Sequence, residues 1–277
     1  MNRILFERDE IRDGVATFGG ERAEHVLNVL HGEVGQILKT GEIDGLIGTS
    51  VIEEIRGTGV PPVPRGKDCG TGILPVHVGA ETVISVRCSH TEESRRPWVD
   101  LILAPPRPRV MKRLLPQLAT LGVGRIFLVG AKKVEKDFWG ATLLKPENYR
   151  PLLIDGLMQA GTSILPTLET RRNFRKFVTE ELDALFPSPT RIVAHPYGAS
   201  DNLTIAPSDQ SANQTTKQPN NHPILLAIGP EGGWTDEEVA LLEGHGFTRY
   251  SLGSRILRTD TATIALLAQL MQVYDQV

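Results

Sequence analysis

The chain has 277 residues, 40% of them hydrophobic, a formal net charge of −3 and two cysteines, Cys69 and Cys88. The length predicts two domains, and two cysteines provide neither a disulfide framework nor a metal-ligand cluster. No apolar run reaches the roughly 20 residues that span a membrane, and charges from Glu7 onward leave no signal-peptide core, so we expect a cytoplasmic protein with no membrane partner and no metal.

The first part of the chain is predicted to fold as short strands around one helix. Apolar side chains at helical spacing indicate an amphipathic helix over residues 21–30. Residues 36–39 and 46–52 have the composition of strands, and glycines separate them. Residues 50–55 and 81–88 are expected to pair as a β-hairpin around the segment that lies between them.

Residues 57–79 contain an internal repeat. The sequence Gly-Thr-Gly-Val that begins at Gly57 returns as Gly-Thr-Gly-Ile at Gly70. Glycine and proline at this density exclude a regular helix, and proline confines any strand to a sheet edge. We therefore predict an insertion that forms a surface loop, with few cations for an RNA-binding arm.

Beyond about residue 97, buried strands alternate with helices, which is typical of an α/β domain. Apolar runs predict strands over residues 98–104, 124–130, 191–197, 223–228 and 247–252. Because most of these runs are apolar at nearly every position, we expect the strands to be buried on both faces.

The densest group of basic residues follows the strand over residues 98–104. It consists of Arg107, Arg109, Lys112 and Arg113, at the start of a helix that runs to residue 121. Cations at a helix N-terminus oppose the helix dipole, so their presence favours a function such as binding RNA phosphates over a merely solvated helix start. Since the net charge is slightly negative, any RNA affinity must come from such a local patch.

Residues 200–222 are rich in asparagine, glutamine, serine and threonine and contain almost no large apolar side chains. Such a segment cannot bury enough apolar surface to form a packed element. We predict a flexible surface loop between the strands over residues 191–197 and 223–228.

A glycine-rich turn, Ile228-Gly229-Pro230-Glu231-Gly232-Gly233, follows the strand over residues 223–228. Glycine permits positive φ and close approach of the backbone to a ligand, and proline stiffens the loop. Thr235 and Glu238 have the spacing of a capping box, which predicts a helix from Asp236 to Glu243. Taken alone, the turn is equally consistent with a tight strand-to-helix connection that binds nothing.

A second glycine turn follows the strand over residues 247–252. Gly253 allows a sharp exit, and Arg255 and Arg258 flank an apolar pair before the closing helix. We expect Thr259 to cap this helix. Its core stripe is predicted to consist of Ile264, Leu267, Ala268 and Met271. Because ligands of α/β sheets bind at the carboxyl ends of strands, two such turns on neighbouring strands predict a backbone-lined crevice.

The segments from Ile228 to Gly233 and from Leu252 to Ala262 closely resemble the RsmE-type RNA methyltransferases of the SPOUT superfamily. The resemblance implies S-adenosylmethionine as cofactor and methylation of N3 of a uridine in 16S rRNA of the small ribosomal subunit. It also implies a SPOUT domain over residues 97–277, with a deep trefoil knot and a mostly parallel sheet, that forms a homodimer. A small PUA-like β-barrel domain over residues 1–90, carrying the insertion at 57–79, would precede it.

The family pattern also implies roles for individual residues of this chain. Arg258 is expected to stabilise negative charge on the uracil ring, and Asp260 to accept its proton or cap the helix. Cofactor contacts are expected from both turns and from the end of the strand over residues 191–197, namely His195, Ile228, Gly229, Pro230, Gly232, Gly233, Leu252, Gly253, Ile256, Leu257, Thr259 and Thr261. RNA contacts are expected from Arg3, His25, Arg107, Arg109, Lys112 and Arg113.

The chain departs from the family pattern at four positions. Asp260 and Thr120 stand where the family has glutamate. His31 and Thr162 stand where it has arginine. The last three lie where RNA contact is expected rather than on the glycine turns. Two alternatives therefore stay open, which are methylation of a different RNA and a non-catalytic rRNA-binding assembly factor.

Overall fold

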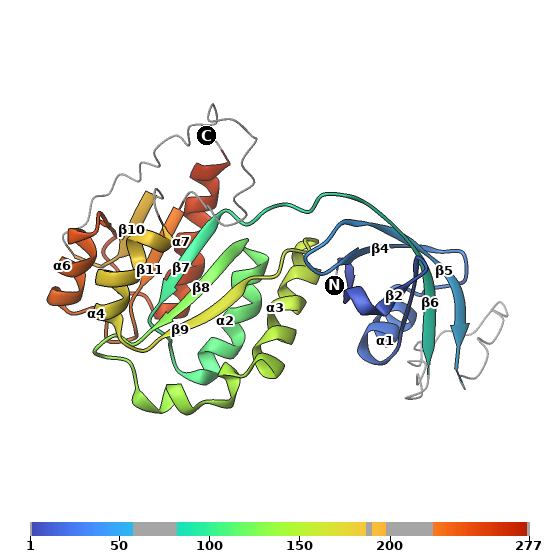
Figure 1. Ribbon diagram of the computed structural model, residues 1–277, viewed down its shortest axis with the longest axis horizontal. Coiled ribbons are helices and arrows are strands. Elements are labelled where there is room, and N and C mark those ends of the chain that lie inside the picture. Colours follow the sequence, from blue (N-terminus) through green and yellow to red (C-terminus); the bar gives the residue numbers. More distant parts are fainter. Residues whose placement is uncertain (1, 58–81, 187–189, 198–223, 276–277) are drawn as a thin grey trace, which may run out of the picture. The chain divides into compact units, whose positions relative to one another are not determined.

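The computed structural model describes residues 2–57, 82–186, 190–197 and 224–275, which form two compact units (Figure 1). Unit 1 comprises Met1–Arg95 with Gly161–Ser163, and unit 2 comprises Arg96–Ala160 with Ile164–Val277. Nearly all of the predicted insertion and the whole predicted polar loop lie outside the described residues. Within the described ranges, each helix is too short or too polar to cross a membrane.

Unit 1 is built on a six-stranded sheet in the order β1-β4-β5-β6-β3-β2, in which only the pair β1–β4 is parallel. The elements are β1 (Ile4–Phe6), β2 (Ile11–Arg12), β3 (Val15–Phe18), α1 (Gly20–Asn28), β4 (Ile37–Glu42), β5 (Ile47–Arg56) and β6 (Val83–Glu92). The predicted helix and the predicted hairpin are confirmed, since Ser50 pairs with Cys88 and Ile55 with Ile84.

The core of unit 1 lies between α1 and one face of this sheet. Residues alternate between buried and exposed along the first half of β5, as a sheet with one solvated face requires. Phe6, Ile52 and Ile84 are fully buried, and Val26 of α1 packs in the same cluster. The apolar spacing of the helix therefore identified the face that covers the sheet.

A polar network in unit 1 gives a testable pH dependence. The buried Thr40 hydroxyl contacts Ser50 Oγ at 2.6 Å and His90 Nε2 at 2.8 Å. Burial lowers the pKa of His90 from its ordinary 6.5, and the charge of Arg3 lowers it further against an opposing effect of Glu42. The unfolded chain therefore takes up this proton at a higher pH than the folded chain.

We expect the contribution of His90 to stability to be complete above its unfolded pKa of 6.5 and to be lost as the pH falls below that value. Urea unfolding at a series of pH values between about 7.5 and 5.5 measures the effect. The variant His90→Gln keeps a polar side chain without the titration, so its free energy of unfolding should fall less over this range. Equal pH dependence in both proteins would contradict the assignment.

Unit 2 contains six parallel strands in the order β12-β10-β11-β7-β8-β9. The strands are β7 (Val99–Leu103), β8 (Val123–Val129), β9 (Thr167–Arg171), β10 (Thr190–Ala194), β11 (Ile224–Ile228) and β12 (Thr248–Tyr250). The helices are α2 (Pro108–Thr120), α3 (Pro146–Ala160), α4 (Phe174–Lys176), α5 (Leu182–Leu185), α6 (Asp236–Gly244) and α7 (Thr259–Tyr274). The prediction of an α/β domain with a mostly parallel sheet is confirmed.

Helices cover both faces of this sheet, with α2 and α3 on one side and α4 and α6 on the other in Figure 1. The strands β7 and β11 are buried along their whole length, as predicted from their apolar composition. One core cluster joins Phe127 of β8 and Leu225 of β11 to Phe174, Phe177 and Val239 beneath α4 and α6. This packing fixes the strand ends that carry the loops described below.

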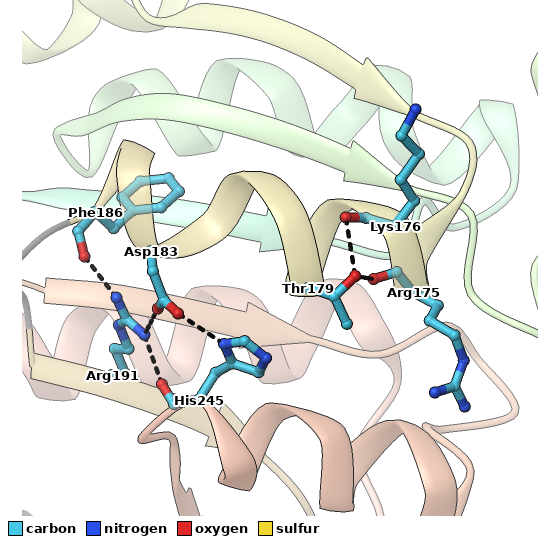
Figure 2. Close-up of polar contacts among 7 residues, drawn as sticks. All are labelled: Arg175, Lys176, Thr179, Asp183, Phe186, Arg191 and His245. Carbon is cyan, nitrogen blue, oxygen red and sulfur yellow. Dashed lines mark hydrogen bonds and ion pairs between the residues drawn. The ribbon is translucent and has the colours of Figure 1, made fainter.

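An ion-pair cluster fastens the amino-terminal end of β10 (Figure 2). The Asp183 carboxylate contacts the Arg191 guanidinium at 2.5 Å and His245 Nδ1 at 2.9 Å. Arg191 also donates hydrogen bonds to the backbone carbonyls of Phe186 and His245. The cluster thereby ties α5, β10 and the end of α6 together, and β10 carries the predicted site residue His195 just beyond its other end.

The closing helix α7 buries a different face from the one predicted. Its buried residues are Thr259, Thr263, Leu266, Leu267 and Leu270, so only Leu267 of the predicted stripe is correct. The predicted cap is also wrong, because Arg258 occupies the N-cap position. Thr263 donates its hydroxyl to the Thr259 carbonyl at 2.7 Å, and the Thr259 hydroxyl donates to the Gly229 carbonyl at 3.4 Å. Both hydroxyls are therefore hydrogen-bonded, which makes their burial possible.

Candidate functional site

The site begins with the order of three strands. β10 lies between β12 and β11 and is parallel to both, so the carboxyl ends of all three meet at one edge of the sheet. The segments that follow these strands, together with the start of α7, line a cleft of about 500 Å³. This volume falls in the range of small-molecule sites.

The first glycine turn forms one wall of the cleft. Gly229 leaves little room for a side chain, since a Cβ there would lie 3.0 Å from the backbone nitrogen of Trp234. Gly233 has φ of 69° and donates its amide to the Pro230 carbonyl at 2.8 Å. Close packing against Trp234 therefore favours glycine at the first position of the turn, and a left-handed backbone conformation favours it at Gly233.

Two carboxylates hold this turn in place. Glu231 Oε1 accepts a hydrogen bond from the backbone amide of Arg107 at 3.0 Å, at the start of α2. Glu238 Oε1 accepts one from the backbone amide of Lys132 at 2.7 Å. The Lys133 ammonium adds a hydrogen bond to the Gly232 carbonyl at 2.7 Å. The turn is thus fastened to segments far away in the sequence, which preorganises the wall of the cleft.

The predicted capping box at the start of α6 is confirmed. Thr235 accepts from the Glu238 amide, and the Glu238 side chain accepts from the Thr235 amide at 2.9 Å. We expect Thr235→Ala to lower the free energy of unfolding by about 1 kcal/mol, because the amide loses its acceptor. Thr235→Ser retains the hydroxyl and serves as the control in chemical denaturation. Equal losses in both variants would show that the cap contributes nothing.

The second glycine turn forms the opposite wall. Gly253 has φ of 105°, and the Ser251 hydroxyl closes the turn by accepting the Gly253 amide at 3.2 Å. Ile256 is 75% exposed, and both Ile256 and Leu257 line the cleft. The Thr259 hydroxyl donates to the Gly229 carbonyl at 3.4 Å, so the beginning of α7 is joined directly to the first turn.

The cleft brings together most residues that were predicted to contact the cofactor. Ten of them line it, namely His195, Ile228, Gly229, Pro230, Gly232, Gly233, Leu252, Ile256, Leu257 and Thr259. Gly253 and Thr261 do not line it, because Gly253 shapes the turn from outside and Thr261 is exposed on α7. Sequence reasoning missed Lys133 and Tyr250, whose only signal was their position at strand ends.

His195 contributes its backbone as well as its ring to the site. Its amide donates to the Tyr250 carbonyl at 3.1 Å, which continues the pairing of β10 with β12. The ring nitrogen Nδ1 lies 2.7 Å from the Tyr197 carbonyl. The ring is therefore oriented by its own loop, and His195 is among the residues that line the cleft.

The two predicted catalytic residues lie at the start of α7, beside rather than within the lining of the cleft. Arg258 is exposed at the N-cap. Asp260 is half-buried and pairs with Arg113 of α2, with 3.7 Å between the charged groups. The structure thus joins a predicted catalytic residue to a predicted RNA-binding residue, which the sequence separation conceals.

The remaining residues of the predicted RNA patch are exposed on α2. Arg107 pairs with Glu135 at 3.0 Å, while Arg109 and Lys112 point their charges into solvent. In unit 1, by contrast, Arg3 donates to the carbonyls of Gly161, Thr40 and Gly48 at 2.6–3.0 Å. Its guanidinium therefore holds the protein's own backbone together, and contact of Arg3 with RNA stays a prediction.

His25 is the other residue of unit 1 that was predicted to contact RNA. Its Nε2 atom is buried and lacks a hydrogen-bond partner among the described residues, as does Oδ1 of Asn28 one helical turn later. A buried polar atom without a hydrogen-bond partner lowers the stability of the fold, so a bound polar group that paired with these atoms would be favoured. RNA contact by His25 stays a prediction.

The chemical character of the cleft suits S-adenosylmethionine. Ile228, Leu252 and Leu266 give the cleft apolar walls, and the two glycine turns place backbone groups beside them, as small-molecule sites commonly do. Glu231, Asp236 and Arg255 also line the cleft, so charged side chains of both signs are available to a zwitterionic ligand. Nothing in this set resembles a metal site, and the described residues contain no cluster of three or more metal-ligating side chains.

Comparison with known proteins agrees with this geometry. The family model described as RNA methyltransferase domain matches residues 92–271. Over 273 residues the chain is 28% identical to ribosomal RNA small subunit methyltransferase E of Treponema pallidum, covering 97% of this chain and 90% of that protein. A Synechocystis protein of the same name is 34% identical over 51% of this chain and 45% of its own length.

Solved structures share the fold. A methyltransferase of Legionella pneumophila with bound SAM aligns with a TM-score of 0.69 and 24% identity, covering 98% of this chain and 97% of the other. Ribosomal RNA small subunit methyltransferase E of Neisseria gonorrhoeae, bound to S-adenosyl methionine, aligns with a TM-score of 0.66 and 18% identity, covering 99% and 98%.

Proposed function

Because the chain belongs to the RNA methyltransferase family, we propose that it methylates N3 of a uridine in 16S rRNA of the small ribosomal subunit. The protein is an S-adenosylmethionine-dependent rRNA methyltransferase. The observation that carries the proposal is the cleft between two glycine turns, which gathers ten of the twelve residues expected to bind this cofactor.

The cofactor supplies an electrophilic methyl group when it is bound, so the protein must position the nucleophile and manage one proton. Uridine N3 carries a proton at neutral pH and lies on the Watson–Crick edge, so the base must be unpaired or flipped out. We propose that Arg258 stabilises the negative charge that develops on the uracil ring. That charge arises as Asp260 accepts the N3 proton, directly or through water, while Arg113 keeps the Asp260 carboxylate oriented.

We further propose the family's domain organisation. Residues 1–90 would be the PUA-like β-barrel domain that positions RNA, and residues 97–277 the SPOUT domain with its deep trefoil knot. The knot rests on the family resemblance of the two glycine turns, which the hydrogen bond from Thr259 to Gly229 brings into contact. A cytoplasmic location follows from a ribosomal substrate.

A homodimer through the SPOUT domain is part of the same proposal. Apolar side chains are exposed around the cleft, at Tyr197, Ile256, Leu257 and Ile264. Exposed apolar surface of this kind is typical of an interface with another chain. A dimer would cover these residues beside the site.

Incubation with labelled S-adenosylmethionine and small ribosomal subunits from cells that lack the gene tests the proposal. We expect label in 16S rRNA that digests to 3-methyluridine. Label in another RNA would favour the alternative substrate. Cofactor binding without transfer to any RNA would favour the assembly factor and contradict the proposed activity.

A further inference from the structure

A second cavity, of about 360 Å³, lies at the same edge of the sheet of unit 2. It forms beyond the carboxyl ends of β8 and β9, where Gly130 and Arg172 pack so closely that a Cβ on Gly130 would overlap the Arg172 carbonyl. The start of α6 closes it, with Thr235 and Glu238 in its wall. None of the residues predicted to bind the cofactor lines this cavity.

The charged side chains around this cavity favour an anion. Lys132, Arg172 and Arg175 line it and are exposed, and no ion pair links any of them to a carboxylate within the described part of the chain. Glu238 is already occupied by three donors, which are the amides of Lys132 and Thr235 and the Thr235 hydroxyl. Glu237 and Glu238 are the two carboxylates in the lining, so three cations stand against two negative charges. The Arg172 guanidinium also donates to the Trp139 carbonyl at 3.3 Å and lies over its ring, so Lys132 and Arg175 carry the inference.

The second cavity shares a wall with the cofactor cleft. Lys132 lines the second cavity and its neighbour Lys133 lines the cleft, so a single residue step separates them. The linings are also in contact. Phe174 lines the second cavity and stacks on Trp234, which lines the cleft, with ring centroids 5.1 Å apart. A ligand in one cavity is therefore the close neighbour of a ligand in the other.

We propose that this second cavity binds a backbone phosphate of the RNA substrate, next to the nucleotide that enters the cofactor cleft. The inference rests on the proposed function. An RNA chain carries a phosphate on each side of a target nucleotide. Cations that bind one of these phosphates fix the position of the RNA along the protein without reading its sequence. The cavity would thereby position the target base over the methyl group.

Helix α4 offers a matched control within one turn. Figure 2 shows the side chains of Arg175 and Lys176 extending from the helix in opposite directions. Arg175 lines the cavity, whereas Lys176 lies outside it and pairs with Glu180 at 3.9 Å. Arg175→Gln and Lys176→Gln therefore remove the same charge from adjacent residues, one inside the cavity and one outside.

The test measures binding of the full chain to small-subunit rRNA over a range of salt concentrations. For Lys132→Gln and for Arg175→Gln we expect weaker binding and a salt slope reduced by about 1. KM for RNA should rise while kcat and the affinity for S-adenosylmethionine stay unchanged. Lys176→Gln should match the wild type, and Glu237→Gln should bind RNA more tightly because it removes the opposing charge.

Unchanged RNA affinity and salt slope in both cavity variants would overturn the inference, provided that the wild-type protein transfers methyl groups. Variants that lose affinity for inorganic phosphate but keep RNA affinity would also overturn it, since the cavity would then hold a free anion. Absence of transfer by the wild type would instead contradict the proposed function, so the two failures are distinguishable.

Discussion

Replacement of Arg258 by alanine is expected to reduce kcat for methyl transfer by about 10²–10³-fold, while S-adenosylmethionine binds nearly as before. The residue is exposed at the N-cap of α7 and does not line the cleft, so its loss leaves the walls intact. The negative charge on the uracil ring would then lack the guanidinium that we propose stabilises it. Single-turnover transfer and calorimetric titration of the cofactor measure the two effects separately.

Two further variants serve as controls for the effect of Arg258→Ala. Arg258→Lys keeps the positive charge and should retain more activity than Arg258→Ala. Arg249→Ala removes a surface arginine that pairs with Glu243 at 2.7 Å, and it should leave transfer unchanged. If Arg258→Ala turned over at the wild-type rate, the arginine would have no part in the chemistry.

Replacement of Gly229 by valine is expected to weaken cofactor binding by at least about tenfold, which corresponds to 1.4 kcal/mol, the low end of overpacking costs. Even the first carbon of the side chain would lie 3.0 Å from the Trp234 backbone nitrogen and 3.2 Å from its indole nitrogen. The added branch must therefore displace either Trp234 or the turn itself. Both form walls of the cleft.

The choice of Gly229 follows from a comparison of the glycines. A Cβ on Gly232 would meet the Lys133 side chain, which is flexible and can move aside. Gly244 near the end of α6 has nothing within 4 Å, so Gly244→Ala is the control and should bind the cofactor normally. Normal cofactor affinity in Gly229→Val, measured by calorimetry, would show that this turn does not contact the cofactor.

Local signals in the sequence predicted the parts of the site that depend on local geometry. The two glycine turns, the capping box of Thr235 and Glu238, and the strands that lead into the cleft all lie where the pattern places them. These features arise from residues within a few positions of one another. Propensity and spacing are therefore sufficient to identify them.

Contacts between distant segments could not be predicted in this way. Asp260 meets Arg113 and Arg3 meets Gly161 only because the fold brings them together. Burial of Thr259 is a similar case, since its hydroxyl bonds to Gly229 thirty residues earlier. Apolar periodicity alone placed Ile264 in the core, whereas hydrogen bonding places Thr263 there.

The most direct test of the central claim is primer extension across 16S rRNA from cells with and without the gene. A methyl group on uridine N3 blocks Watson–Crick pairing and stops reverse transcriptase. We expect one stop at a uridine that disappears with the gene, returns with the wild-type gene and does not return with Arg258→Ala. An identical pattern of stops in all four strains would contradict methylation of uridine N3 in 16S rRNA by this protein.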